Sequence, residues 1–248
     1  MLELVDFPTS QGIRSLSPFG YKAEALVAMT GKDYRKIPPD PALMPHGKVP
    51  VLRDGDEIVP DSSLIQRHLE KHHGLAVDAR LTGQERAVAE AFRRMSEEHL
   101  RWVLVYSRWI DPASEEVMIS AAFGALPEEA GRKTVLDIRG QVTGYLHTQG
   151  LGRHAREDIY RFGADDLDAI AAWLDDKPFL MGDSPTSVDA AVVGVLYAIL
   201  ACASDTPLFA YARALQTLPA YVVRFERTVF GDKANIPADL IGMAEIAA

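Results

Sequence analysis

The stretch RSLSPFGYKAE, residues 14–24, decides how this 248-residue chain folds. It follows a short apolar run, LELVDF (2–7), which is typical of a β-strand, and Pro18 stands where a helix would begin. The helical pattern then continues to Gly31. A strand is therefore predicted to turn directly into a helix, with Ser17 at the corner.

The composition is that of an ordinary globular protein, with 48% hydrophobic and 25% charged residues and a mean hydropathy of −0.04. The net charge of −9 argues against nucleic-acid binding through a basic face. One cysteine, Cys202, excludes an intrachain disulfide and a CxxC zinc site, and fits a reducing compartment. The N-terminus lacks the pattern of a signal peptide, and the longest apolar run (190–203) is too short to span a bilayer. We expect a cytoplasmic protein.

The first part of the chain predicts the order strand, helix, strand, loop, strand, strand, helix. Strands are expected at 2–7 and 34–37, and a hairpin is expected about the Asp54-Gly55 turn. Ser62 or Ser63 opens the second helix, where Ser63 and Gln66 have capping-box spacing, and Gly74 ends it. This pattern predicts a small α/β domain at residues 1–74.

From Thr82 onward the periodicity is helical. We expect an all-helical domain at 82–248, joined to the first by a linker at 75–81. One long helix is predicted at 83–110, and further helices at 114–124, 127–149, 154–175, 186–203, 207–215 and 218–229.

Two short stretches of the first domain have the chemistry of a binding site. Pro50 in KVPVL is either an edge-strand proline in trans or part of a cis Val49–Pro50 bond that turns the Val49 backbone toward a ligand. Asp61 and Ser62 stand at the predicted start of a helix. Free N–H groups and the hydroxyl there would bind a carboxylate, and Asp61 would accept hydrogen bonds from an adjacent ammonium group. Taken by itself, the second stretch is more simply explained as a plain N-cap.

These motifs together resemble the cytosolic glutathione transferase superfamily. The resemblance rests on SPFG at a helix start, GKVPVL, DSSLI and a following helical half, in that order. PFLMGDSPTSVDAAVVGVL (178–196) resembles the helical-domain signature, in which Thr186 and Asp189 form a capping box that serves folding. Residues 17–24, 99–109 and 163–183 are most similar to the branch with metaxins, failed-axon-connections proteins and bacterial relatives.

The resemblance implies a thioredoxin-like domain that binds glutathione. Pro50 would then be the cis-proline, and the Val49 backbone would pair with the cysteinyl part of glutathione. Asp61 and Ser62 would hold the γ-glutamyl end. Lys48 would reach the glycyl carboxylate unless it is merely solvated, and His46 is a weaker candidate in the same loop.

Ser17 and Gly20 occupy the positions at which thioredoxin-type domains carry the C-P-x-C cysteines. The resemblance therefore makes the glutathione sulfur the nucleophile, with the Ser17 hydroxyl stabilising its thiolate at a helix N-terminus. The alternative is that Ser17 only caps the helix. Ser10 and Ser15 are competing hydroxyls, whereas Tyr21 falls inside the helix.

The long helix carries an aromatic stripe, His99, Trp102, Tyr106 and Trp109, at i, i+3, i+7 and i+10. This stripe is either a wall for a flat apolar co-substrate or ordinary core packing. Arg101 and Arg108 lie on another face and are expected to be solvated. His72 and His73 are interpreted as helix-end charge, and no metal site is expected.

The sequence leads to a glutathione transferase that conjugates or reduces a small apolar electrophile. Glutathione as co-substrate and a homodimer follow from the resemblance, and a role in detoxification, without nucleic-acid or membrane partners, is expected. The alternative is a non-catalytic binding or adaptor protein of metaxin type. A dehalogenase or isomerase of the same fold is a third hypothesis.

Overall fold

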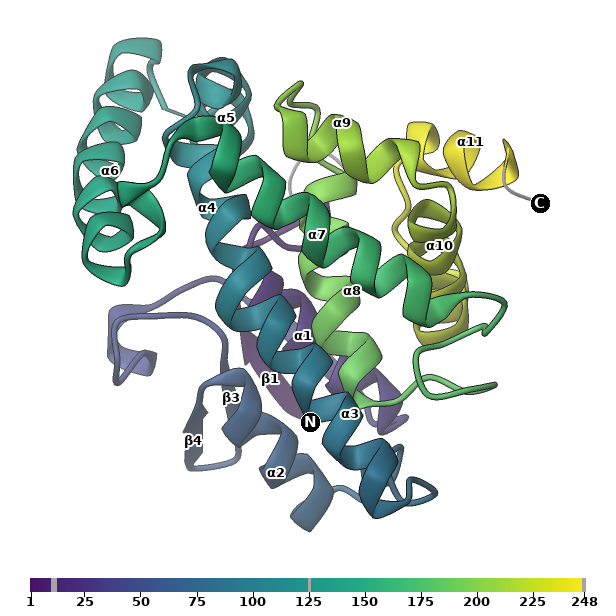
Figure 1. The fold of residues 1–248 in the computed structure, drawn as a ribbon. Coiled ribbons are helices and arrows are strands. Elements are labelled where there is room, and N and C mark those ends of the chain that lie inside the picture. Colours follow the sequence, from purple (N-terminus) through teal and green to yellow (C-terminus); the bar gives the residue numbers. More distant parts are fainter. Residues whose placement is uncertain (10–12, 125, 247–248) are drawn as a thin grey trace.

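The computed structural model describes residues 1–9, 13–124 and 126–246 (Figure 1). A sheet of order β2-β1-β3-β4 forms the base of the N-terminal part. β1 (Leu2–Val5) pairs in parallel with β2 (Tyr34–Ile37) and antiparallel with β3 (Val51–Asp54), which forms the predicted hairpin with β4 (Glu57–Pro60). A short 3-10 turn, η1 (Pro41–Leu43), lies in the loop before β3. The predicted order of strands and helices along this part of the chain is confirmed.

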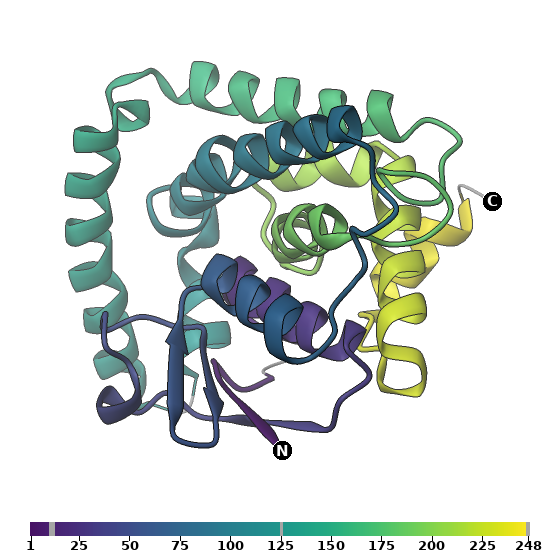
Figure 2. The same ribbon diagram turned by 90° about the horizontal axis from the view of Figure 1, so that it is seen from below.

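Two helices lie side by side between this sheet and the helical half of the chain (Figure 2). α1 (Pro18–Met29) starts at the predicted proline, and α2 (Ser62–His72) starts at Ser62. α1 is buried over most of its length because the sheet lies on one side of it and α8 (Ser187–Leu200) packs on the other (Figure 2). Ser17, at the start of α1, therefore lies where the two halves of the molecule meet.

The remaining elements are helical, as predicted. α8 stands in the middle of this half (Figure 2), where α1, α3, α9 and α10 pack against it, and all its residues are buried. The other elements are α3 (Gly83–Arg94), η2 (Met95–Leu100), α4 (Arg101–Trp109), η3 (Pro112–Ser114), α5 (Glu115–Phe123), α6 (Glu128–Gln149), η4 (Leu151–Arg153), α7 (Arg156–Leu174), α8 (Ser187–Leu200), α9 (Pro207–Ala214), α10 (Thr217–Phe230), η5 (Gly231–Lys233) and α11 (Ala238–Ile246).

Two features differ from the sequence prediction. The long helix is interrupted by the π-helical segment η2, whose Glu97 forms a buried ion pair with Lys22 of α1 at 2.7 Å. A π turn takes one more residue than an α turn, so the side chains after it change direction by about 100°. The terminal helix α11, which follows Pro237, was not predicted.

The predicted capping box at the start of α8 is confirmed. The buried Asp189 carboxylate accepts hydrogen bonds from the Thr186 N–H and hydroxyl at 2.7 Å each, from the Leu180 N–H at 2.8 Å and from the Tyr221 hydroxyl at 2.6 Å. α8 therefore begins at a buried polar network that ties it to α10.

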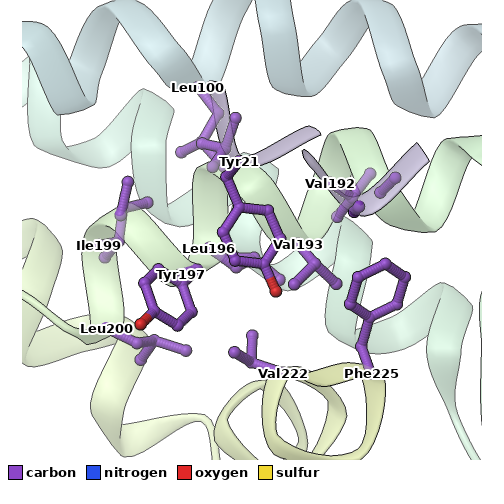
Figure 3. Close-up of a cluster of buried hydrophobic side chains, with 14 of the residues drawn as sticks. Tyr21, Leu100, Val192, Val193, Leu196, Tyr197, Ile199, Leu200, Val222 and Phe225 are labelled. Atoms are coloured by element: carbon purple, nitrogen blue, oxygen red, sulfur yellow. The ribbon is translucent and has the colours of Figure 1, made fainter. Parts of the chain in front are cut away.

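A large hydrophobic core joins α1 to the helical half (Figure 3). The Tyr21 ring of α1 packs 4.8 Å from the Tyr197 ring and 6.4 Å from the Phe225 ring. Within the described residues, no helix combines the length and apolar character that crossing a bilayer requires.

Candidate functional site

Two cavities adjoin at the corner where β1 leads into α1, and Phe19 lines both. The first has a volume of about 240 Å³ and the second about 360 Å³. The first lies among residues of the N-terminal part only, namely Phe19, His46, Lys48, Val49, Pro50, Pro60, Asp61 and Ser62. All five residues predicted to bind glutathione are in this set.

The first cavity has the Val49–Pro50 peptide on one side, and this bond is cis. Pro50 is buried and its carbonyl accepts a hydrogen bond from the Asp61 N–H at 3.3 Å. The two sequence-distant stretches are thereby joined at one edge of the sheet. Lys48 and His46 line the same cavity and are exposed.

Asp61 is the N-cap of α2, with a positive φ of 73°. Its Oδ1 accepts from the N–H of Ser63 at 2.7 Å and from the N–H of Leu64 at 3.3 Å. The predicted Ser63–Gln66 capping box is wrong, because Asp61 takes the capping role and the Gln66 amide donates to Glu70 instead. Ser62, next in the chain, is buried against the cavity.

Ser17 lines the second cavity and is the N-cap of α1. Its hydroxyl oxygen accepts a hydrogen bond from the Gly20 N–H at 3.2 Å. The Ser17 N–H donates to the Ser15 hydroxyl at 3.1 Å, and Ser15 is buried. The buried Ser15 hydroxyl therefore fixes the loop backbone by this hydrogen bond, whereas the Ser17 side chain is half-buried beside the cavity.

A buried carboxylate, Asp6, lies behind the corner, and sequence reasoning missed it. A Cβ at Gly20 would come within 2.2 Å of the Asp6 carboxylate, so the second cysteine position must be glycine. The Lys36 ammonium lies 3.4 Å from Asp6. Burial raises the pKa of the Asp6 carboxyl above its ordinary range. The signal in the sequence was an aspartate directly after a strand whose residues, apart from Glu3, are apolar.

The other candidate hydroxyls are in different positions. Tyr21 is completely buried in the core, and burial raises its pKa well above the ordinary tyrosine value. It therefore supplies no donor to either cavity. Ser10 lies outside the described residues.

The second cavity is apolar on most sides and carries two cations. It is bounded by Phe7, Leu16, Ser17, Pro18, Phe19, Arg101, Leu104, Val105, Arg108, Trp109, Met118, Phe123 and Ile138. Its walls therefore come from the α1 corner, α4, α5 and α6. Such a surface suits a small, largely apolar compound.

Arg108 is the unusual residue of this cavity, because it is buried and no carboxylate pairs with it among the described residues. Its guanidinium donates to the carbonyl oxygens of Leu16 at 2.8 Å and Ala198 at 2.7 Å. The Nε atom is buried without a hydrogen-bond partner in the described chain. Burial lowers the pKa of Arg108. The expectation that Arg101 and Arg108 are solvated is wrong.

The predicted aromatic stripe is divided between two surfaces. Trp109 lines the second cavity. The other three residues contact different neighbours: His99 pairs with Asp166 of α7 at 2.6 Å, the Tyr106 ring packs edge-on against Tyr160 of α7, and Trp102 stacks under the Arg101 guanidinium. The cavity side of α4 is instead formed by Arg101, Leu104, Val105 and Arg108.

Both halves of the chain match family models of known proteins. The family model described as glutathione S-transferase N-terminal domain matches residues 18–114, and that of the glutathione S-transferase C-terminal domain matches residues 163–225. An isoprene-epoxide–glutathione S-transferase from Rhodococcus is 33% identical over 92% of this chain and 97% of its own length.

More distant relatives belong to other branches. The Failed axon connections protein of Drosophila melanogaster is 30% identical to this chain. The aligned region covers 79% of this chain and 49% of that protein. Metaxins of human and mouse also match, with 23% identity for human Metaxin-2. A solved glutathione S-transferase from Sinorhizobium meliloti has a TM-score of 0.60 at 14% identity, covering 98% of this chain and 99% of its own. At this identity the structural match shows the fold.

Proposed function

This chain belongs to the glutathione S-transferase family, and we propose that it adds the thiolate of glutathione to a small electrophile with a reactive oxygen, such as an epoxide. The first cavity would hold glutathione, and the second would hold the electrophile. The proposal rests on one observation above all: Phe19 lines both cavities, and Ser17, two residues before it in the chain, lines the second.

The residues of the first cavity suit the two ends of glutathione. The Val49 backbone would pair with the cysteinyl unit as an added strand. Asp61 keeps Oδ2 free of the capping bonds made by Oδ1, so it would accept from the γ-glutamyl ammonium. Ser62 and the free N–H groups of α2 would bind the carboxylate of the same unit, and Lys48 the glycyl carboxylate.

Ser17 would stabilise the thiolate by donating its hydroxyl proton into a hydrogen bond with the sulfur. The N-terminus of α1 adds its partial positive charge at the same place. Both effects lower the pKa of a bound thiol and increase its thiolate fraction at neutral pH. The nucleophile belongs to the ligand, because no cysteine lies at this corner.

With an epoxide in the second cavity, the sulfur would attack one ring carbon. A carbon–sulfur bond forms while a carbon–oxygen bond breaks, and the ring oxygen leaves as an alkoxide that takes a proton from water. Arg108 would stabilise that oxygen, because it is a buried cation beside the cavity with an unused Nε–H donor. The epoxide named for the Rhodococcus relative supports this substrate class.

The direct experiment is calorimetric titration with glutathione, followed by an assay with a small epoxide. We expect binding at millimolar glutathione or below and a thioether product. Absence of binding at millimolar glutathione would exclude the proposed glutathione transferase activity.

The second candidate is a non-catalytic binding protein, and it is favoured by the metaxin and Failed axon connections relatives. The turnover assay separates the two. An adaptor that retained only the fold would show no turnover with any epoxide or aryl halide, whether or not glutathione binds.

We also propose that the chain acts as a cytoplasmic homodimer in detoxification, on the support of the family resemblance and the lone cysteine. Light scattering at micromolar concentration tests the dimer, and a monomer mass would reject it.

A further inference from the structure

A cluster of two histidines and one aspartate lies at the opposite end of α2 from Asp61 and Ser62. Asp54 ends β3, His68 is in the second turn of α2, and His73 directly follows that helix. Nε2 of His68 lies 2.9 Å and Nε2 of His73 lies 2.6 Å from the same oxygen, Oδ2 of Asp54. The three possible ligand atoms all lie within 4.8 Å of one another.

From this geometry we propose that Asp54, His68 and His73 bind a divalent transition metal ion of the zinc class. Zinc lies about 2.0–2.2 Å from imidazole nitrogen and carboxylate oxygen, so tetrahedral ligand atoms are about 3.3 Å apart. The present nitrogen–oxygen distances of 2.6 and 2.9 Å need to open by only about half an ångström for that arrangement. An ion would take the place of the two hydrogen bonds that now join the imidazoles to the carboxylate.

The surroundings of His68 are those of a metal ligand. Its other ring nitrogen, Nδ1, faces the Glu57 carboxylate of β4 at 3.5 Å. Metal-bound histidines commonly donate this second N–H to a carboxylate, which fixes the ring and makes the first nitrogen a better donor. The His68 side chain is only 6% exposed, so its orientation is held by packing.

The site is open on one side. The side chains of His73 and Asp54 are 18% and 29% exposed, which leaves room for water as a fourth ligand. Imidazole nitrogen with one carboxylate suits zinc, cobalt, nickel or copper better than magnesium or calcium, which prefer all-oxygen sites.

A bound ion would fasten the β3–β4 hairpin to the end of α2. That helix presents Asp61 and Ser62 at its other end, so the ion would stabilise the domain from a point remote from the ligand cavities. The metal site does not depend on the proposed transferase activity, and glutathione binding is measured separately.

The test is a titration of the untagged protein with cobalt, read by visible absorption, and with zinc, read by calorimetry and thermal unfolding. We expect one ion per chain, the intense visible bands of four-coordinate cobalt, and a rise in melting temperature with zinc. His73→Gln and Asp54→Asn should each weaken binding by about tenfold or more.

His72→Gln is the matched control, because His72 is the neighbouring exposed imidazole and its ring lies 4.8 Å from that of His68. It should leave the affinity and the cobalt spectrum unchanged. The proposal is overturned if no ion binds at one per chain, if His73→Gln binds as tightly as wild type, or if His72→Gln weakens binding equally.

Discussion

The Ser17 hydroxyl oxygen accepts a hydrogen bond from the Gly20 N–H at 3.2 Å, which makes Ser17 the cap of α1. This contact uses a lone pair of the oxygen and leaves the hydroxyl proton available to another acceptor. Capping and thiolate stabilisation, which the sequence presents as alternatives, therefore use different parts of one side chain. A bound thiolate beside the same helix end would be that second acceptor.

Substituting Ser17 tests the donor separately from the cap. Ser17→Ala removes both, and we expect kcat/KM for glutathione conjugation to fall by about 10–100-fold, as for the loss of one charge-assisted hydrogen bond. The unfolding free energy should fall by about 0.5–2 kcal/mol through the lost cap. Ser17→Gly restores most of the capping preference and should be as inactive as Ser17→Ala.

The matched control for the cap is Thr82→Ala, which removes the N-cap hydroxyl of α3 far from either cavity. It should lower stability and leave steady-state rates unchanged. Recovery of activity in Ser17→Gly would show that the hydroxyl served only as a cap.

Arg108→Lys tests the stabilisation of the leaving oxygen. Lysine keeps the charge but lacks the guanidinium fork that reaches Leu16 and Ala198 and carries the spare Nε–H. We expect kcat/KM to fall by about tenfold or more with an epoxide and by less than about threefold with an aryl halide, whose leaving group is a halide ion. Parallel steady-state assays measure both.

Arg101→Lys is the control in the same cavity, because the Arg101 Nε already donates to the Glu97 carbonyl at 2.8 Å. It should not separate the two substrates. Equal losses with epoxide and aryl halide in Arg108→Lys would contradict the role of Arg108.

Asp6 predicts a pH dependence of stability. Its pKa is raised by burial, so the native state holds a proton on this group at a pH where the unfolded chain has released it. Wild-type stability relative to Asp6→Asn should therefore fall as the pH rises from about 4 toward neutrality. The Lys36 ammonium at 3.4 Å limits the fall. Urea unfolding of both proteins from pH 4 to 7 measures the difference, and a rise with pH would reject the buried-acid account.

Asp189 predicts a purely structural defect. Asp189→Asn removes the charge and replaces one acceptor oxygen by a donor, so the groups of Leu180, Thr186 and Tyr221 are left with too few acceptors in the core. We expect a loss of about 3 kcal/mol or more in urea unfolding. Glu85→Gln, the corresponding position of the exposed capping box on α3, should have a much smaller effect. Similar losses in the two variants would contradict the importance of burial.

Local signals in the sequence predicted most of the fold and the first cavity. Pro18, the Asp54-Gly55 turn and the Thr186–Asp189 box fix element ends through contacts within a few residues, and each lies as expected. Val49 and Asp61 come from short motifs whose residues line one cavity.

The second cavity was harder to predict because its wall depends on the rotation of α4. Apolar residues occur on both sides of this helix, since α7 covers one side and the cavity lies on the other. The π-helical segment before α4 adds a further change of phase. Trp102 and Tyr106 of the predicted stripe are thus each one position away from the cavity residues Arg101 and Val105, whereas Trp109 does line the cavity.

Contacts between distant segments were not predictable from spacing. Asp6 meets Gly20 only because the corner folds back on the strand, and Asp54 meets His73 only because the hairpin lies beside the end of α2. Local spacing predicts only helix-end charge at His72 and His73, because the Asp54 carboxylate is nineteen residues away from His73 in the sequence.

The most direct test of the central claim is the pKa of the glutathione thiol bound to the protein, measured by ultraviolet absorbance of the thiolate in wild type and Ser17→Ala. A free thiol has a pKa of about 8.5, and we expect the bound thiol of the wild type to lie about two pH units lower. In Ser17→Ala it should return upward by about one unit or more. An identical bound-thiol pKa in the two proteins would contradict the assignment of Ser17 as the thiolate's hydrogen-bond donor.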